Sequence, residues 1–431
     1  MMTLVIGGIF FATILIGVPI AFAMGLAGST WILFFQHIEP TILVRRFYFS
    51  LNSFPLLAIP LFIMLGLLAD RARMLPHLVV WLQMILGRLR GGMAYINVIA
   101  AMLFAGISGT AVSDIASLGR TLIQLMTRAG YPLTYSAALT SATSIIGPII
   151  PPSVSMIIYA LAVGNVSVGA MFAGGAIPGV LFGVGFLVMA NVTTRRGRYG
   201  VVQAWPSRAD FLRQTLRVLP LLVLPVIIVG GIFSGVFTVT ESAAVGVAYT
   251  MLVGFLSKPR LRIRDIYDAT LYSAVISAVA GMLLGAGAIV SWVFTYNQVT
   301  QSLADWLTAM NLSPGAFMVA VVVALLILGM LMDAVPIIIA LAPLLAPIAA
   351  HYGISDIQFG LVFVVTCMIG LVTPPVGIIL FMTSTLTGVK LEPLSIAVFP
   401  LVVWMTIVVL LMIFVPTLTL WLPHAVGLVA P

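Results

Sequence analysis

The chain contains very little charge for its length. Of its 431 residues only 7% are Asp, Glu, Lys or Arg, while 62% are hydrophobic. A soluble globular domain carries roughly 25% charged residues, so a soluble protein of this composition would lack polar surface to present to water. The scarcity of charge therefore excludes the common soluble classes and indicates a protein of the lipid bilayer.

Residues that support redox, metal or nucleotide chemistry are also scarce. The single cysteine, Cys367, excludes an internal disulfide. The histidines, none of them at metal-ligand spacing, are His37, His77, His351 and His424. No segment matches the phosphate-binding pattern G-x-x-x-x-G-K-[ST], and no catalytic dyad stands within the apolar runs. We therefore predict neither an enzyme nor a transition-metal site nor an organic cofactor.

Long apolar runs are present instead. Each approaches or exceeds the roughly 20 residues that cross a bilayer as a helix. They are Met1–Phe35, Gly169–Val192, Val218–Phe237, Ala243–Leu256, Leu271–Phe294, Gly315–Met332 and Ser395–Leu422. The first run has no basic start and no cleavage site, so Met1–Ile20 is predicted to be a membrane helix and not a signal peptide. The expected fold class is an all-α integral membrane protein.

Basic residues gather in a few short segments between these runs. Two of the segments contain Arg195, Arg196, Arg198, Arg208, Arg213, Arg217, Lys258, Arg260, Arg262 and Arg264. The positive-inside rule places such segments in the cytoplasm, so the net charge of +8 does not indicate nucleic-acid binding. The resulting topology also puts Arg71, Arg73, Arg88, Arg90, Arg120 and Arg128 inside. Arg45 and Arg46 fall outside, which is the one clear violation of the rule.

Between Arg90 and Arg120 the chain leaves the cytoplasmic side and returns to it. The middle of this stretch, Ala105–Gly119, is too polar and too rich in glycine to face lipid. Irregular backbone at membrane depth is tolerated only where protein buries it or where it lines a cavity. We therefore predict a re-entrant hairpin over about residues 92–128. Upstream of it, Met74–Leu89 is expected to lie along the membrane surface.

The second half of the chain resembles the first. When Gly130 is aligned with Gly353, the pattern Ile-Gly-x-x-x-Pro-Pro coincides in both halves, with Pro151-Pro152 opposite Pro374-Pro375. An odd number of crossings in each half inverts the second copy relative to the first, as in many secondary transporters. The similarity therefore predicts an inverted repeat.

The predicted architecture has about ten spanning helices and two re-entrant hairpins. The first repeat covers residues 1–215 and the second covers residues 216–431. The first broken helix is expected at about 133–163, the second hairpin at about 314–350 and the second broken helix at about 355–388.

Adjacent prolines inside a membrane helix break it, because proline has no N–H and its ring clashes with the preceding turn. The carbonyls that this break frees are costly in lipid unless something coordinates them. A cation can use them, and the helix that restarts after the break points its positive end at an anion. The alternative is a structural kink whose carbonyls are satisfied by neighbouring helices.

Oxygen-bearing side chains stand in the first predicted hairpin. Ser108, Thr110 and Asp114 offer hydroxyls and one carboxylate, which suit Na⁺ and provide no nitrogen or sulfur for a transition metal. An aspartate at membrane depth usually has a partner or a role. Asp114 can instead cap a short helix, and capping and ion binding can both hold.

Two further carboxylates have alternative roles. Asp333 is the counterpart in the second hairpin, where it either caps a helix or binds an ion, and Thr373 would add a hydroxyl. Glu241 follows the turn at Gly235 on the outer side. It is either a capping-box carboxylate for the next helix or a docking contact for a partner.

Taken together, these motifs resemble the large membrane subunit, DctM-like, of tripartite ATP-independent periplasmic (TRAP) transporters. The resemblance covers essentially the whole chain. The matching stretches are Gly17–Gly25, Leu57–Phe62, Ile107–Ala111, Ile149–Ser153, Phe237–Ala244 and Thr373–Gly377. At Thr110 many relatives have serine, so the hydroxyl is kept.

The resemblance implies Na⁺-coupled uptake of an organic anion, such as a C4-dicarboxylate or sialic acid, across the bacterial inner membrane. It implies two partners, a periplasmic substrate-binding protein (DctP-like) and a small membrane subunit (DctQ-like). It also implies an elevator carrier of the ion-transporter superfamily, whose hairpins and broken helices move against the other spans. The alternative is a stand-alone ion-coupled dicarboxylate carrier or exchanger without a binding protein.

Site residues are implied by the same resemblance. The residues implied for two Na⁺ sites are Ser108, Thr110, Asp114, Gly147 and Pro151 in one half, and Gly370, Thr373 and Asp333 in the other. The residues implied for the substrate are Gly109, Pro152, Ser153, Ser155, Pro374 and Pro375.

Overall fold

The computed structural model describes residues 2–35, 38–197, 199, 206–257, 260–309 and 312–429, and every regular element in these residues is a helix. The all-α fold class is therefore confirmed. His37, Arg198 and Lys258 lie outside the described residues.

The helices of the first half are α1 (Met2–Leu15), α2 (Ile20–Thr30), the π-helix η1 (Trp31–Phe35), α3 (Thr41–Leu51), the 3₁₀ helix η2 (Phe54–Leu57), α4 (Ala58–Arg71), α5 (Met74–Leu86), α6 (Gly92–Ser108), α7 (Ala111–Asp114), the π-helix η3 (Ile115–Gly119), α8 (Arg120–Arg128), α9 (Leu133–Ser144), α10 (Val154–Val163) and α11 (Val168–Gly197). The helices of the second half are α12 (Arg208–Phe233), α13 (Val239–Leu256), α14 (Ile263–Tyr296), α15 (Val299–Ala309), α16 (Pro314–Leu331), α17 (Ala334–His351), α18 (Asp356–Gly370), α19 (Ile378–Thr387), α20 (Leu391–Phe414) and α21 (Thr417–Ala425).

Eight helical segments of the described chain are long and apolar enough to cross a bilayer. They are η2 with α4, α11, α12, α13, α14, α16, α17 and α20. About ten spanning helices were expected, and the difference arises because several apolar runs are interrupted and form shorter helices. The chain is a multi-pass membrane protein.

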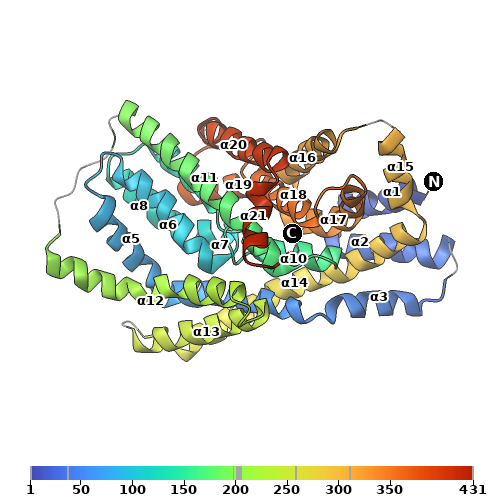
Figure 1. The fold of residues 1–431 in the computed structure, drawn as a ribbon, viewed down its shortest axis with the longest axis horizontal. Coiled ribbons are helices and arrows are strands. Elements are labelled where there is room, and N and C mark those ends of the chain that lie inside the picture. Colours follow the sequence, from blue (N-terminus) through green and yellow to red (C-terminus); the bar gives the residue numbers. More distant parts are fainter. Residues whose placement is uncertain are drawn as a thin grey trace.

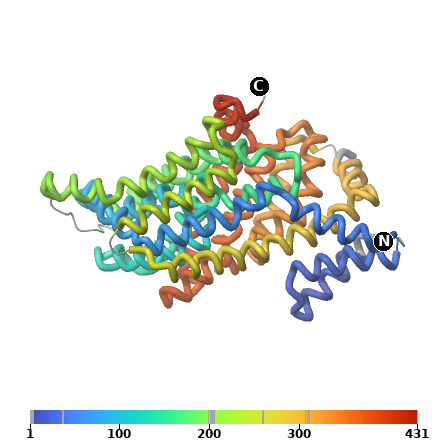
Figure 2. The backbone as a smooth tube through the Cα atoms, turned by 90° about the horizontal axis from the view of Figure 1, so that it is seen from below, coloured from blue at the N-terminus to red at the C-terminus, as the bar shows by residue number. Residues whose placement is uncertain are grey.

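The first apolar run is not one helix. α1 ends at Leu15, Gly17 has φ +87°, and Pro19 precedes α2. A left-handed residue and a proline both end a helix, so the helix expected over Met1–Ile20 stops at Leu15, and α2 and η1 form the rest of the apolar run. α1 and α2 pack against each other. They lie at one end of the molecule (Figure 1) and project from it in the view from below (Figure 2).

Each range predicted as a hairpin or broken helix holds two helical stretches with an interruption between them. α6 ends where Gly109 takes φ +64°, and α7, η3 and α8 follow. α9 and α10 are separated by residues 145–153, with a cis peptide at Pro151-Pro152. In the second half residues 332–333 separate α16 from α17. Residues 371–377 separate α18 from α19 and include a cis peptide at Pro374-Pro375.

The interrupted helices lie inside the molecule. Figure 1 shows α3, α12, α13 and α14 along one long edge and α11, α16 and α20 along the other, with α7, α10 and α18 between them. α9, α10 and α18 are buried over most of their length. Protein therefore encloses the irregular backbone of the first break, whose prolines Pro151 and Pro152 are buried.

Candidate functional site

Asp114 is the one charged side chain that is buried in the described part of the chain, with 4% of its surface exposed. Its Oδ1 accepts a hydrogen bond from the Ser108 hydroxyl. Its Oδ2 has no partner among the described residues. Leaving a buried carboxylate oxygen unpaired is costly, so this atom requires a positive group or a proton nearby.

The local sequence explains how Asp114 reaches this position. Gly109, with φ +64°, ends α6 directly after Ser108 and turns the chain. The Thr110 hydroxyl then accepts a hydrogen bond from the Ser113 N–H at 3.3 Å and caps α7. One helical turn after this cap, Asp114 faces back to Ser108. Thr110 therefore shapes the hairpin tip and uses its hydroxyl as a helix cap.

Glycine allows the tip of the first hairpin to contact the first broken helix. A Cβ atom added to Gly147 would lie 2.2 Å from the Asp114 Oδ2, so only a hydrogen fits between them. A Cβ on Gly109 would lie 2.8 Å from the Pro152 carbonyl oxygen. The Val154 N–H also donates to the Gly109 carbonyl at 3.4 Å. The structure thus brings the tip and the break together around Asp114.

The second hairpin contacts the second broken helix in the same way but through other residues. A Cβ on Gly370 would lie 2.5 Å from the Gly329 Cα, and the Gly377 N–H donates to the Met330 carbonyl at 3.2 Å. Asp333 is exposed, and its Oδ1 accepts from the Ala334 N–H at 2.6 Å. The aspartate is the N-cap of α17, which was one of its two expected roles.

Thr373 and the serines that follow the first break are held by local hydrogen bonds. The Thr373 hydroxyl donates to the Ile369 carbonyl at 2.7 Å. Ser153 donates to the Pro148 carbonyl at 2.6 Å and accepts from the Met156 N–H at 3.2 Å, so it caps α10. Ser155 is buried, with its hydroxyl 4.0 Å from the sulfur of Met368 in the second half.

The two proline pairs differ in exposure. Pro151 and Pro152 are buried, whereas Pro374 is half-buried and Pro375 is exposed. The first break is therefore enclosed by protein, and the second reaches the protein surface.

Glu241 has the geometry of a helix cap. Its carboxylate accepts from the Thr238 N–H at 2.8 Å, and the Thr238 hydroxyl accepts from the Glu241 N–H at 3.3 Å. This reciprocal capping box begins α13 and was one of the two roles predicted for Glu241. The docking role stays a prediction.

A buried polar network was not predicted. Asn97 in α6 donates to the Thr140 hydroxyl at 2.7 Å and accepts from the Thr143 hydroxyl at 2.8 Å. In addition, Ser141 of α9 donates to the Thr383 hydroxyl of α19 at 2.8 Å. The sequence signal for the Asn97 network is an asparagine within an otherwise apolar helix, because a buried amide without a hydrogen-bond partner is costly.

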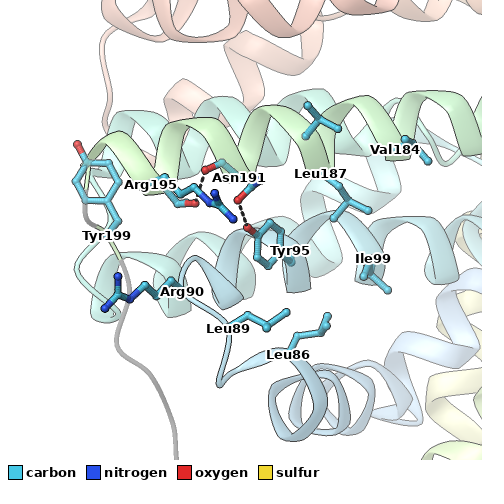
Figure 3. A pocket seen from close by; sticks show the side chains of 12 residues that line it. Leu86, Leu89, Arg90, Tyr95, Ile99, Val184, Leu187, Asn191, Arg195 and Tyr199 are labelled. Carbon is cyan, nitrogen blue, oxygen red and sulfur yellow. Dashed lines mark hydrogen bonds between the residues drawn. The ribbon is translucent and has the colours of Figure 1, made fainter.

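A large cavity lies away from these residues, at an end where basic residues gather. It measures about 1270 Å³, and Figure 3 shows Arg90 and Arg195 at one end and Ile99 and Val184 at the other. Tyr95 and Asn191 both line it, and the Tyr95 hydroxyl donates a hydrogen bond to the Asn191 Oδ1 at 2.9 Å. The predicted ion and substrate residues do not line this cavity. A second cavity of about 510 Å³ lies between α3, α10, α14 and α17.

Comparison with known proteins identifies the family. The model of the family "Tripartite ATP-independent periplasmic transporter, DctM component" matches residues 7–418. The chain belongs to this DctM family. It is a component of a membrane transporter and not an enzyme, as the sequence predicted.

Named relatives support this assignment. The C4-dicarboxylate TRAP transporter large permease protein DctM of Pseudomonas aeruginosa is 34% identical over 408 residues, covering 94% of this chain and 95% of the relative. The sialic acid TRAP transporter large permease protein SiaM of Vibrio cholerae is 31% identical over 408 residues, covering 95% of each.

The fold of this DctM-family chain is also that of a solved transporter. The YdaH transporter of Alcanivorax borkumensis superimposes with a TM-score of 0.62 at 17% identity, covering 89% of this chain and 88% of the other. At this identity the similarity concerns the fold alone.

Proposed function

We propose that this chain is the translocating subunit of a tripartite system for Na⁺-coupled uptake of an organic carboxylate across the bacterial inner membrane. A periplasmic binding protein delivers the acid, and a small membrane subunit supports the large one. The two relatives described above are named for C4-dicarboxylates and sialic acid, which are organic acids. In this proposal the two halves are inverted repeats, and their hairpins and broken helices move together as an elevator.

The observation that carries the proposal is the unpaired Oδ2 of buried Asp114. It stands where the hairpin tip meets the broken helix, beside Gly147. Carboxylate, hydroxyl and carbonyl oxygens are hard ligands that suit Na⁺. A cation held by Asp114 and Ser108, with carbonyls near Gly147–Pro151, would neutralise the buried carboxylate and fix the tip against the break.

The anion site follows from the same arrangement. α10 and α19 begin directly after the breaks, and the first N–H groups of a helix form its positive end. Na⁺ that fixes the tips would complete this site for a carboxylate. Because coupling between two binding sites is reciprocal, the acid would raise the affinity for Na⁺ by the same factor.

The test measures uptake of labelled succinate and N-acetylneuraminate into proteoliposomes that hold the chain with its small subunit and binding protein. Asp114→Asn keeps the shape of the side chain and removes its negative charge, so we expect uptake to lose its dependence on a Na⁺ gradient. The control is Asp268→Asn, which removes an exposed carboxylate 3.8 Å from Arg71. Wild-type Na⁺ dependence in Asp114→Asn would remove Asp114 from the ion site. Full uptake without the binding protein would favour the stand-alone carrier.

A further inference from the structure

Arg46, one of the two arginines that violate the positive-inside rule, has a defined place in the structure. Arg71, at the end of α4, lies 3.3 Å from Asp265 in the first turn of α14, at the basic end of both helices. Arg46 contacts Trp292, which follows Asp265 by 27 residues in the continuous helix α14. A helix of that length measures about 40 Å, which exceeds the hydrocarbon thickness of about 30 Å. α14 is a candidate span, so Arg46 lies at its outer end, opposite Arg71.

The Arg46 side chain faces a cavity. It lines the cavity of about 510 Å³, with its guanidinium carbon 5.7 Å from the ring centroid of Trp292. Trp292 is near the end of α14, where aromatic residues mark a membrane interface. Among the described residues, no carboxylate lies within ion-pair distance of the Arg46 guanidinium. The Arg46 charge is thus held by an aromatic face and has no carboxylate partner in that part of the chain.

The walls of this cavity come from two sets of elements. One wall belongs to α3 and α14, which pack together along the edge of the molecule (Figure 1). The other belongs to α10 and α17, which are the helices that follow the first break and the second hairpin tip. α17 contributes Ile339 and Pro343, and α10 contributes Leu161 and Ala162. The cavity therefore lies at the boundary between α3 and α14 on one side and the helices that follow the first break and the second hairpin tip on the other.

The lining suits a small organic anion. Besides Arg46 it has the hydroxyl side chains of Ser291 and Tyr296. The hydroxyls of Ser50 and Thr295 also line it and donate to carbonyls of their own helices. A guanidinium binds a carboxylate through two parallel hydrogen bonds, and the volume lies within the roughly 300–1,000 Å³ of small-molecule sites. The remaining lining is aliphatic or aromatic, which accommodates a carbon skeleton.

We propose that this cavity is an outer entry site, where Arg46 binds the carboxylate of the incoming acid before the acid reaches the hairpin tips. The proposal rests on the proposed function, because it takes the acid as cargo. It also accounts for Arg46 on the outer side, since an anion arriving there needs a cation on its path. A lipid phosphate has the same charge and is the competing occupant.

The first experiment compares uptake kinetics of Arg46→Gln with those of Arg45→Gln. Both variants remove one charge from exposed positions of the same helix, but only Arg46 lines the cavity. We expect Arg46→Gln to raise the apparent KM for the acid about tenfold, the scale of a lost charge-assisted hydrogen bond, with kcat within twofold. Arg46→Lys should recover part of the loss, and Arg45→Gln should match the wild type.

The second experiment detects the acid in the cavity directly and without the binding protein. Cys367 is fully buried, so a cysteine placed in the cavity wall would supply the accessible thiol. We expect the transported acid to slow maleimide labelling of Ser50→Cys severalfold, and to have no effect when Arg46→Gln is also present. Tyr48→Cys, on the exposed side of α3, is the control.

The outcomes separate the two proposals. If the wild type transports neither succinate nor N-acetylneuraminate with Na⁺, the proposed function fails, and the entry site fails with it. If the wild type transports an acid but Ser50→Cys is not protected by it, the entry site alone is overturned. The entry site is also overturned if protection follows the content of anionic phospholipid in the vesicles instead of the acid concentration, because the occupant would then be a lipid.

Discussion

The contact between Gly147 and Asp114 gives a sharp prediction for Gly147→Ala. The φ of Gly147 lies outside the left-handed region, so alanine fits the backbone there and the expected effect is steric. The added methyl group would lie 2.2 Å from the Oδ2 of Asp114, whereas ordinary contacts of this kind begin at 3.4 Å. The carboxylate would therefore have to retreat by about 1 Å or the hairpin tip would have to shift by as much.

The size of the effect follows from that displacement. A misplacement of about 1 Å in a positioned group can cost about 100-fold in function, which corresponds to about 2.7 kcal/mol. We expect Gly147→Ala to raise the Na⁺ concentration for half-maximal uptake by about 10- to 100-fold. The maximal rate at saturating Na⁺ should fall less, because the carboxylate itself is kept.

The assay is initial uptake of the labelled acid as a function of Na⁺ concentration at constant ionic strength. Gly230→Ala is the matched control, because a Cβ at Gly230 meets no atom within 4 Å and alanine favours its helix, α12. The double variant Gly147→Ala/Asp114→Asn should be no worse than Asp114→Asn, since both changes act on one group. A well-folded Gly147→Ala variant with wild-type Na⁺ affinity would refute the placement of the ion at Asp114.

Three further predictions concern stability and are measured by thermal unfolding of the purified chain in detergent. Gly370→Ala should destabilise the fold by about 1–3 kcal/mol, because its Cβ would lie 2.5 Å from the Gly329 backbone; an unchanged Tm would show that α16 and α18 are not in close contact. Asn97→Ala should cost about 1–3 kcal/mol through the lost bonds to Thr140 and Thr143, and a neutral result would contradict the network. Arg71→Ala should change stability by less than about 1 kcal/mol, because its side chain is 49% exposed; a larger loss would mean that the pair with Asp265 is shielded from water.

The interruptions were predictable from the sequence because they arise from strong local rules. A proline pair cannot continue a helix, and a Gly-Thr sequence after an apolar run turns the chain. The same local chemistry located Asp114, since a carboxylate within an apolar stretch requires a partner. These features depend on a few neighbouring residues, which a single sequence shows.

The features that were missed depend on contacts between distant residues. The separation of α1 from α2 depends on a glycine conformation that the apolar composition of Met1–Ile20 conceals. The close contact of Gly370 with Gly329 joins two glycines that lie 41 residues apart in the chain, on α18 and α16. Arg46 was recognised as an exception from its charge, but only packing against α14 shows that it faces Trp292 and a cavity.

The hydrogen bond between Ser141 and Thr383 has a consequence for how the two halves work together. It joins a helix that leads into one break to a helix that leaves the other, deep in the protein and away from solvent. Each hydroxyl also donates to a carbonyl of its own helix, Ser141 to Ala137 at 2.9 Å and Thr383 to Ile379 at 2.8 Å, so moving one helix alone would cost only the bond between the two helices. A buried bond of this kind contributes about 1 kcal/mol, and it favours arrangements in which α9 and α19 shift together.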